Sequence, residues 1–153
     1  MTLDDVMTDF RKLSKALACD ALGELLVREM RSGFANLAEA VSGQARKSVF
    51  FMEWTAPLMG AGNWMPEIIS YGGGDVVLGE NGRHSPTVMW EDIHAADPAV
   101  IIVGPCGFDV GRAREELSTL TNGASWQSLR AVQEREVYIV NGNHFYNRPG
   151  PRL

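Results

Sequence analysis

The stretch AVIIVGPCGFDVGRAREELSTLTN, residues 99–122, decides the fold class. It opens with a continuous apolar run, residues 99–105, of the kind that is buried in a parallel sheet. A turn follows, and Asp109 is then positioned to cap a helix that ends near Asn122. A buried strand that leads into a helix is the repeating unit of α/β proteins.

The same alternation of strand and helix runs through the chain from residue 48 onward. Apolar runs at 48–53, 75–78 and 136–142 predict further strands, and helices are predicted at 64–71, 87–97 and 125–133. Pro66 suits the first turn of the helix at 64–71, and the glycines at 72–74 suit its end. We therefore expect an α/β domain with a small, mostly parallel sheet.

Residues 1–43 carry helical patterning only. Thr2 followed by Asp5 is an N-cap signature, and apolar residues recur at helical spacing up to Leu17. Asp20 is expected to cap a second helix over residues 20–41, which would be roughly 30 Å long at about 1.5 Å per residue. The chain thus divides into amino-terminal helices, residues 1–43, and an α/β unit, residues 44–153.

Composition is that of an ordinary globular protein and excludes one functional class. The 153 residues are 45% apolar and 22% charged, which suits one domain. The net charge of −5 comes without any run of lysine or arginine, so the footprint of a nucleic-acid-binding protein is missing. Bulk charge does not favour an acidic ligand either. Cys19 and Cys106 are too few for a disulfide scaffold or a zinc cluster.

The sequence as it stands predicts neither a secretory signal nor a membrane span. Its first residues, MTLDDVMTDFRKL, are acidic early and lack an uninterrupted apolar core. No stretch approaches the roughly 20 apolar residues that cross a bilayer.

Unusual residues gather after the predicted strands, where parallel α/β sheets bind ligands. The stretch WTAPLMGAGNWMPEII, residues 54–69, holds two tryptophans, and the loops at 84–86, 105–108 and 143–148 add histidine, proline, phenylalanine, asparagine and arginine. Such a rim suits a large, partly apolar ligand with a few polar edges.

Catalytic and metal-binding patterns are weaker. Glu91 and His94 form an ExxH pair on one helix face, and Glu53 and His84 could join them in a cytoplasmic metal-dependent enzyme. A solvated helix face is the more economical interpretation of the pair. Cys106 has no carboxylate spaced to orient a histidine beside it. We therefore expect no enzyme activity, no metal site and no cofactor, and keep the metal enzyme as the alternative.

Two long stretches resemble a known family. They are residues 49–108, beginning VFFMEWTAPLM and ending IIVGPCGF, and residues 126–153, which end in NHFYNRPGPRL. Their ordered motifs include the loop, helix and GG unit, the S.....WE.I...DP..II unit and the terminal RPGPRL. The chain resembles the carboxyl-terminal lobe of the periplasmic substrate-binding proteins of ABC importers for vitamin B12, haem and ferric siderophores, and most of all the cobalamin-binding members.

The resemblance implies a domain organisation. In that family, a class III or helical-backbone metal receptor type, one long helix joins two α/β lobes and the ligand lies between them. Residues 20–41 then correspond to the connecting helix, and residues 44–153 to a Rossmann-like three-layer lobe with a small, mostly parallel sheet. We expect the amino-terminal lobe to be absent.

The resemblance also implies a function and site residues. The chain is expected to be a substrate-binding component for cobalamin or another metal chelate. Cleft-facing loops of the family match Trp54, Trp64, Ser85, Pro86, Phe145 and Arg148, which are the expected ligand contacts. A carboxylate that docks onto arginines of the ABC permease corresponds to Glu91.

Partners and location stay open at this point. The cleft-facing loops could be covered by the missing lobe or by a second copy, which would make the chain a homodimer or a self-associating interaction domain. The resemblance implies a periplasmic or cell-surface location, while the lack of a signal peptide leaves a cytoplasmic one open.

Overall fold

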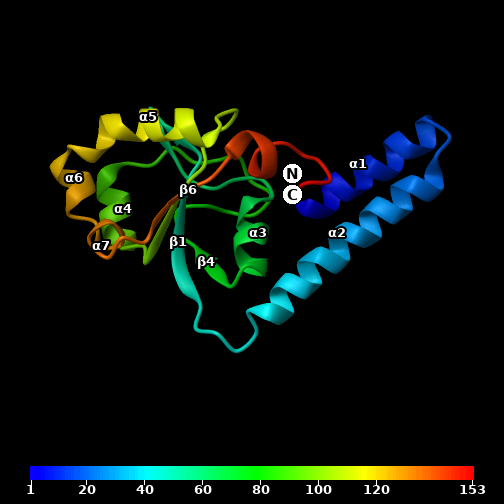
Figure 1. Ribbon diagram of the computed structural model, residues 1–153, viewed down its shortest axis with the longest axis horizontal. Helices are drawn as coiled ribbons and strands as arrows, with labels where there is room; N and C mark the ends of the chain where they lie inside the picture. The colour runs from blue at the N-terminus through cyan, green and yellow to red at the C-terminus, as the bar shows by residue number, and fades with distance from the viewer.

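The computed structural model describes residues 1–153 and shows a helical hairpin that projects from an α/β body (Figure 1). The helices are α1 (Leu3–Ala16), α2 (Asp20–Ala40), α3 (Met65–Tyr71), α4 (Trp90–Ala96), α5 (Val110–Thr121), α6 (Ala124–Gln127), α7 (Arg130–Gln133) and the π-helical turn η1 (Gly142–Tyr146). The strands are β1 (Lys47–Met52), β2 (Trp54–Thr55), β3 (Leu58–Met59), β4 (Gly74–Val76), β5 (Val100–Val103) and β6 (Val137–Ile139). None of the helices is long and apolar enough to cross a membrane.

The main sheet is parallel throughout and confirms the predicted α/β fold. Its strand order is β4-β1-β5-β6, with Val49 opposite both Val76 and Val100, and Ile102 opposite Tyr138. The chain enters at the central strand β1, adds β4 on one side, and then crosses to add β5 and β6 on the other. The carboxyl ends of all four strands therefore meet at one edge of the sheet.

Helices cover both faces of the sheet, which gives the predicted three layers. Along β1, Phe50 and Met52 point to one face, where they pack with side chains of α4 to α7. Val49 and Phe51 point to the opposite face and pack with α1, α2 and α3. Alternate residues of one buried strand thus serve two cores, which explains why the strand is apolar at every position from 49 to 52.

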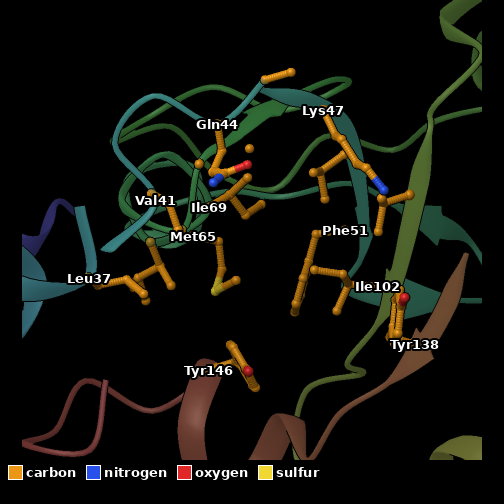
Figure 2. A pocket seen from close by; sticks show the side chains of 17 residues that line it. Leu37, Val41, Gln44, Lys47, Phe51, Met65, Ile69, Ile102, Tyr138 and Tyr146 are labelled. Carbon is orange, nitrogen blue, oxygen red and sulfur yellow. The ribbon is translucent and has the colours of Figure 1, made fainter. Parts of the chain in front are cut away.

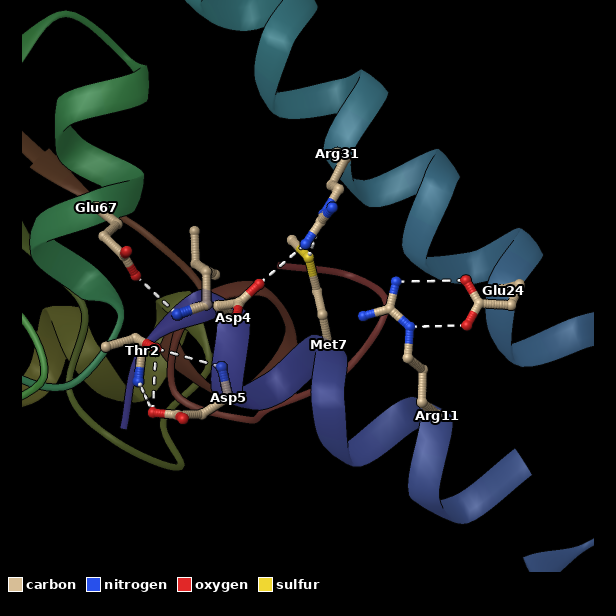
Figure 3. Close-up of polar contacts among 9 residues, drawn as sticks. Thr2, Asp4, Asp5, Met7, Arg11, Glu24, Arg31 and Glu67 are labelled. Atoms are coloured by element: carbon tan, nitrogen blue, oxygen red, sulfur yellow. Dashed lines mark hydrogen bonds and ion pairs between the residues drawn. The ribbon is translucent and has the colours of Figure 1, made fainter. Parts of the chain in front are cut away.

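The helical hairpin is closed by side-chain contacts between its two helices (Figure 3). Both hydrogen bonds of the predicted Thr2–Asp5 capping box are present. Arg11 Nε donates to Glu24 Oε1 at 2.7 Å, and Arg11 Nη2 donates to Glu24 Oε2 at 3.3 Å. A Cβ on Gly23 would overlap the Ser14 side chain, so this glycine permits the close approach of α1 and α2. The hairpin is therefore fixed by both packing and charge.

One detail of the hairpin differs from the prediction. Asp20 is the first residue of α2 and makes no capping hydrogen bond, because the N-cap position is taken by Cys19. The Cys19 N–H donates to Ser14 O at 2.8 Å, and its C=O accepts from Leu22 N–H at 3.0 Å. These bonds place the boundary between the helices at Cys19, one residue earlier than Asp20 would have placed it.

The hairpin is joined to the body at the start of α1. The Leu3 N–H donates to Glu67 Oε2 of α3 at 2.7 Å (Figure 3). Val6 and Met7 of α1 and Phe34 of α2 are buried in the core that α3 shares with the sheet. Much of the surface near the tip of the hairpin is apolar and exposed, including Leu17 at 73% exposure.

One face of the sheet is only partly covered, which leaves an apolar groove of about 570 Å³ (Figure 2). Leu37 and Val41 at the end of α2 form one wall, and Phe51 and Ile102 of the sheet lie opposite. Tyr138, 51% exposed, lies at the β6 side. This groove is on the face of the sheet rather than at the carboxyl ends of its strands.

Candidate functional site

An aromatic pair lies at the centre of the carboxyl edge of the sheet. The connection from β1 leads to β4 on one side of the sheet, and the connection from β5 leads to β6 on the other side. The chain thus reverses its direction across the sheet between β1 and β5, at what is called the switch point. Ligands of α/β sheets bind in the crevice at this point. Trp54, two residues beyond β1, has its ring centroid 5.1 Å from that of Phe108 in the loop after β5, with an interplanar angle of 54°. Phe108 is buried and Trp54 is half-buried, so Phe108 supports an indole that still offers ring surface to a ligand.

A cationic side chain, Arg112, lies against this aromatic pair. The guanidinium carbon of Arg112, in the first turn of α5, lies 4.0 Å from the centre of the Phe108 ring. Arg112 is exposed and makes no ion pair. Asp109 caps α5 as predicted, because its Oδ1 accepts from the Arg112 N–H at 2.9 Å. The switch point therefore combines stacking surface with one free positive charge.

A hydrogen-bonded carboxylate lies beside the pair. Glu53 Oε2 accepts from the Ser85 hydroxyl at 2.7 Å, and the Glu53 C=O accepts from the Cys106 N–H at 3.2 Å. Ser85 is buried, and a Cβ on Gly62 would overlap its backbone and hydroxyl. The hydroxyl of Ser85, predicted to contact ligand, is thus engaged within the protein, where it positions Glu53.

The segment after β6 is held firmly against the same edge. Asn147 Nδ2 donates to Gly104 O at 2.8 Å, and the Asn143 N–H donates to Phe108 O at 3.1 Å. These bonds join η1 to the loop that carries Phe108. π-helical turns are rare and are often found at functional sites.

Trp64, another predicted ligand contact, is placed in the core. Only 7% of its surface is exposed, and its indole N–H donates to Tyr146 O at 2.8 Å. Trp64 immediately precedes α3, and its ring packs in the same core as the apolar face of that helix. It supports η1 from beneath and offers no free ring face, so the cleft-facing position expected for it is corrected.

The remaining predicted contacts, Pro86, Phe145 and Arg148, are not buried, and Phe145 lines a small hollow beside α2. Pro86 is half-buried, and its C=O accepts from the Gly60 N–H at 2.9 Å. Phe145 is 49% exposed and lies edge-on to His144, with ring centroids 5.9 Å apart. Arg148 is exposed and makes no ion pair. Phe145 and Arg148 therefore retain side chains that are free to meet a ligand.

Glu91 lies in the first turn of α4. It is exposed and is in no ion pair, whereas its neighbour Asp92 accepts from the Met89 N–H at 2.8 Å. The segment before α4 is tied to the hairpin of β2 and β3, because the Val88 N–H donates to Leu58 O at 2.9 Å. Glu91 is thus a free carboxylate on a fixed support near the carboxyl edge.

The alternative metal site is not assembled. No three histidine, cysteine, aspartate or glutamate side chains lie close enough together to hold a metal ion. Glu53 is bonded to Ser85, and His84 Nδ1 lies 3.0 Å from the Ser85 carbonyl oxygen. The metal-enzyme alternative therefore has no geometry to support it.

Comparison with known sequences decides the family. The profile of the periplasmic binding protein family matches residues 2–143, which is almost the whole chain. The chain belongs to the periplasmic binding protein family. The predicted resemblance is thereby confirmed, and the prediction that the chain is not an enzyme agrees with membership of a family of binding proteins.

Relatives of this periplasmic binding protein chain match it in sequence or in fold over nearly its whole length. A vitamin B12-binding protein of Vibrio campbellii is 22% identical over 99% of this chain and 52% of its own. An Fe³⁺-hydroxamate transport protein from Saccharomonospora viridis superposes with a TM-score of 0.80 at 19% identity, over 99% of this chain and 52% of its own. A periplasmic haem-binding protein from Roseiflexus gives 0.75 at 20% identity, over 99% and 58%. The chain thus spans about half the length of these relatives.

Arg112 was not among the predicted site residues of this periplasmic binding protein, and Phe108 was predicted only as part of the rim loop 105–108, not as a ligand contact. Their signal was present, since Phe108 lies in the loop after a predicted buried strand and Arg112 in the first turn of the helix that follows. What the sequence did not supply was the strand order, which places that loop beside Trp54. The hairpin of β2 and β3 and the turn η1 were also not predicted.

Proposed function

We propose that this chain is the carboxyl-terminal lobe of a substrate-binding protein that delivers cobalamin or a similar metal chelate to an ABC importer. The observation that carries the proposal is the Trp54–Phe108 pair at the switch point of a periplasmic binding protein lobe. A macrocycle or chelate has a broad, partly apolar surface, which stacks well on an indole. The vitamin B12-binding relative supports cobalamin as the first ligand to test.

In this proposal the two parts of the chain have different roles. Residues 1–43 provide the amino-terminal helices, with α2 as the helix that connects two lobes, and residues 44–153 provide the carboxyl-terminal lobe. The exposed leucines of the hairpin would pack against the amino-terminal lobe. They are Leu13, Leu17, Leu22 and Leu25. The ligand would then be held between the Trp54 surface and that second lobe.

Delivery requires contact with the permease, and we assign that contact to Glu91. A free, exposed carboxylate at the start of α4 can form charge-assisted hydrogen bonds with arginines of a partner. A periplasmic or cell-surface location follows from the same proposal. Metal chemistry by the protein is not required, because the chelate brings its own metal.

Titration with cyanocobalamin, and separately with haemin, tests the proposal. Absorbance and calorimetry of the wild-type chain should show saturable binding of one of them, and Trp54→Ala should weaken it. A folded protein that binds neither chelate, alone or when joined to an amino-terminal lobe, would refute the proposal.

The second candidate function is self-association. The apolar groove beneath Leu37 and Val41 and the exposed hairpin leucines are surfaces that a second copy could cover. Sedimentation velocity over a wide concentration range distinguishes the two. A stable dimer without chelate binding would favour self-association, and a monomer that binds chelate would exclude it.

A further inference from the structure

A basic hollow of about 430 Å³ opens between η1 and the end of the chain. It is lined by residues 143–144 and 148–152, of which two are prolines and the rest are polar, charged or glycine. It adjoins the aromatic pair, because Asn143 in its wall is hydrogen-bonded through its N–H to the Phe108 carbonyl oxygen at 3.1 Å. The hollow therefore lies next to the loop that carries Phe108.

The charge in the hollow is opposite to that of the whole chain. The protein has 19 acidic and 14 basic residues, yet no carboxylate lines the hollow, while Arg148, Arg152 and His144 do. Neither guanidinium takes part in any of the seven ion pairs of the structure. Two unpaired arginines that face one hollow repel each other, so an anion between them would be stabilised.

The wall of the hollow also holds an unused hydrogen-bonding group. The Asn143 side-chain oxygen is the one buried side-chain N or O atom without a hydrogen-bond partner. Most such atoms in folded proteins are paired, so this oxygen is an exception among the buried polar groups of the protein. The turn that carries Asn143 is held in place through Asn147 and Trp64, as described above.

We propose that the basic hollow binds an oxyanion, a carboxylate or a phosphate, that belongs to the ligand stacked on Trp54. This proposal rests on the function proposed above and makes it more specific. Arg148 and Arg152 bind the oxyanion through charge-assisted hydrogen bonds, which on arginine can be bidentate. The favoured ligand is thus anionic along one edge and flat and apolar elsewhere.

The test uses citrate and inorganic phosphate as separate probes, at low ionic strength, on the full 153-residue chain. Chemical shifts of the backbone amides are followed in the wild type, Arg148→Gln, Arg152→Gln and the control Arg114→Gln. Arg114 is exposed on α5, makes no ion pair and does not line the hollow. The same four proteins are titrated with haemin, which carries carboxylates, and with cyanocobalamin, which carries a phosphate. A dispersed amide spectrum shows that each variant is folded.

We expect one probe to shift the amides of residues 142–152 saturably. Arg148→Gln and Arg152→Gln should each weaken that probe and the corresponding chelate by about tenfold, with Arg114→Gln unchanged. A response to citrate and haemin identifies a carboxylate, and a response to phosphate and cyanocobalamin identifies a phosphate. Chelate binding that is equally tight in both arginine variants would overturn the oxyanion proposal and leave the proposed function standing. Oxyanion binding without chelate binding would contradict the proposed function and leave oxyanion binding in the hollow standing.

Discussion

Trp54 and Phe108 lie in contact at the switch point of the sheet, with ring centroids 5.1 Å apart, although 54 positions separate them in the sequence. They meet because β1 and β5 are neighbours in the parallel sheet and their following loops leave from the same edge. Phe108 fixes the indole from the protein side. Its outer surface is then available to a ligand without first having to be ordered, which reduces the entropic cost of binding.

The first prediction concerns Trp54. Trp54→Ala should weaken binding of the cognate chelate about tenfold or more, because aromatic stacking and buried ring area are lost. Trp54→Phe should retain most of the affinity. Calorimetric titration checks both variants. Equal affinities for the alanine variant and the wild type would mean that the ligand binds elsewhere.

The second prediction concerns Trp64, whose position in the core contrasts with that of Trp54. Trp64→Phe keeps much of the apolar ring but removes the N–H that bonds to Tyr146 O. The free energy of unfolding should fall by about 1–3 kcal/mol, since a part-buried carbonyl loses its partner and a smaller ring leaves space. Urea unfolding measures the change, and hydrogen exchange of residues 142–147 should accelerate. Unchanged exchange there would contradict the supporting role given to Trp64.

A third prediction compares two glycines. A Cβ on Gly142 would overlap the carbonyl oxygens of Pro105 and Gly104, so Gly142→Ala should separate η1 from the loop after β5 and lower the melting temperature. Gly33, within α2, has nothing within 4 Å of the position that a Cβ would occupy, and Gly33→Ala should stabilise the helix by roughly 0.5–1 kcal/mol. Thermal unfolding of both variants is the measurement. If Gly142→Ala were as stable as Gly33→Ala, the close contact at η1 would be refuted.

The fourth prediction is a pH dependence of the hairpin. The hydrogen bond from Arg11 lowers the pKa of Glu24 below its ordinary value of 4.5, and the reverse effect raises the pKa of Arg11. Because the folded-state pKa of Glu24 is the lower one, its stabilising contribution is present above the unfolded pKa and is lost as pH falls through the folded value. The difference in melting temperature between the wild type and Glu24→Gln should therefore shrink as the solution is acidified below pH 4.5. A titration of Glu24 by NMR at or above 4.5 would contradict this account.

The fifth prediction separates delivery from binding. Glu91→Ala should leave stability and chelate affinity unchanged, since Glu91 is exposed and makes no ion pair, but should reduce uptake when present in the complete binding protein. The control is Glu39→Ala, which removes an exposed and unpaired carboxylate from α2. Uptake of labelled cobalamin checks both. Normal uptake with Glu91→Ala would remove the docking role.

Local sequence signals predicted much of the fold. The Thr2–Asp5 capping box, the Asp109 cap, Pro66 at the start of α3 and the apolar runs of β1 and β5 all depend on residues close in sequence, and each is confirmed. Gly73 adopts a positive φ of 79° after α3, as expected for a helix end. Short elements with little apolar patterning, such as the two-residue strands β2 and β3, were missed because they are defined by tertiary contacts.

The site was harder to predict, because its geometry depends on which loops the strand order brings together. Two tryptophans ten positions apart have opposite environments, and only the packing of α3 against the sheet determines that Trp64 is buried. Likewise, the sequence alone gives Ser85 a free hydroxyl, whereas in the structure that hydroxyl donates to Glu53. The arginines of the basic hollow are separated from the aromatic pair in sequence, and the link between the two is the hydrogen bond from η1 to the Phe108 carbonyl oxygen.

The measurement that tests the central claim most directly is chemical-shift mapping of the chain with cyanocobalamin and with haemin, each raised to millimolar concentration so that weak binding by a single lobe is detected. We expect one chelate to shift the amides of residues 53–55, 104–112 and 142–148 saturably, at the carboxyl edge around Trp54 and Phe108. Shifts confined to the apolar groove beneath α2, or none with either chelate, would contradict the claim that this edge is the ligand-binding surface.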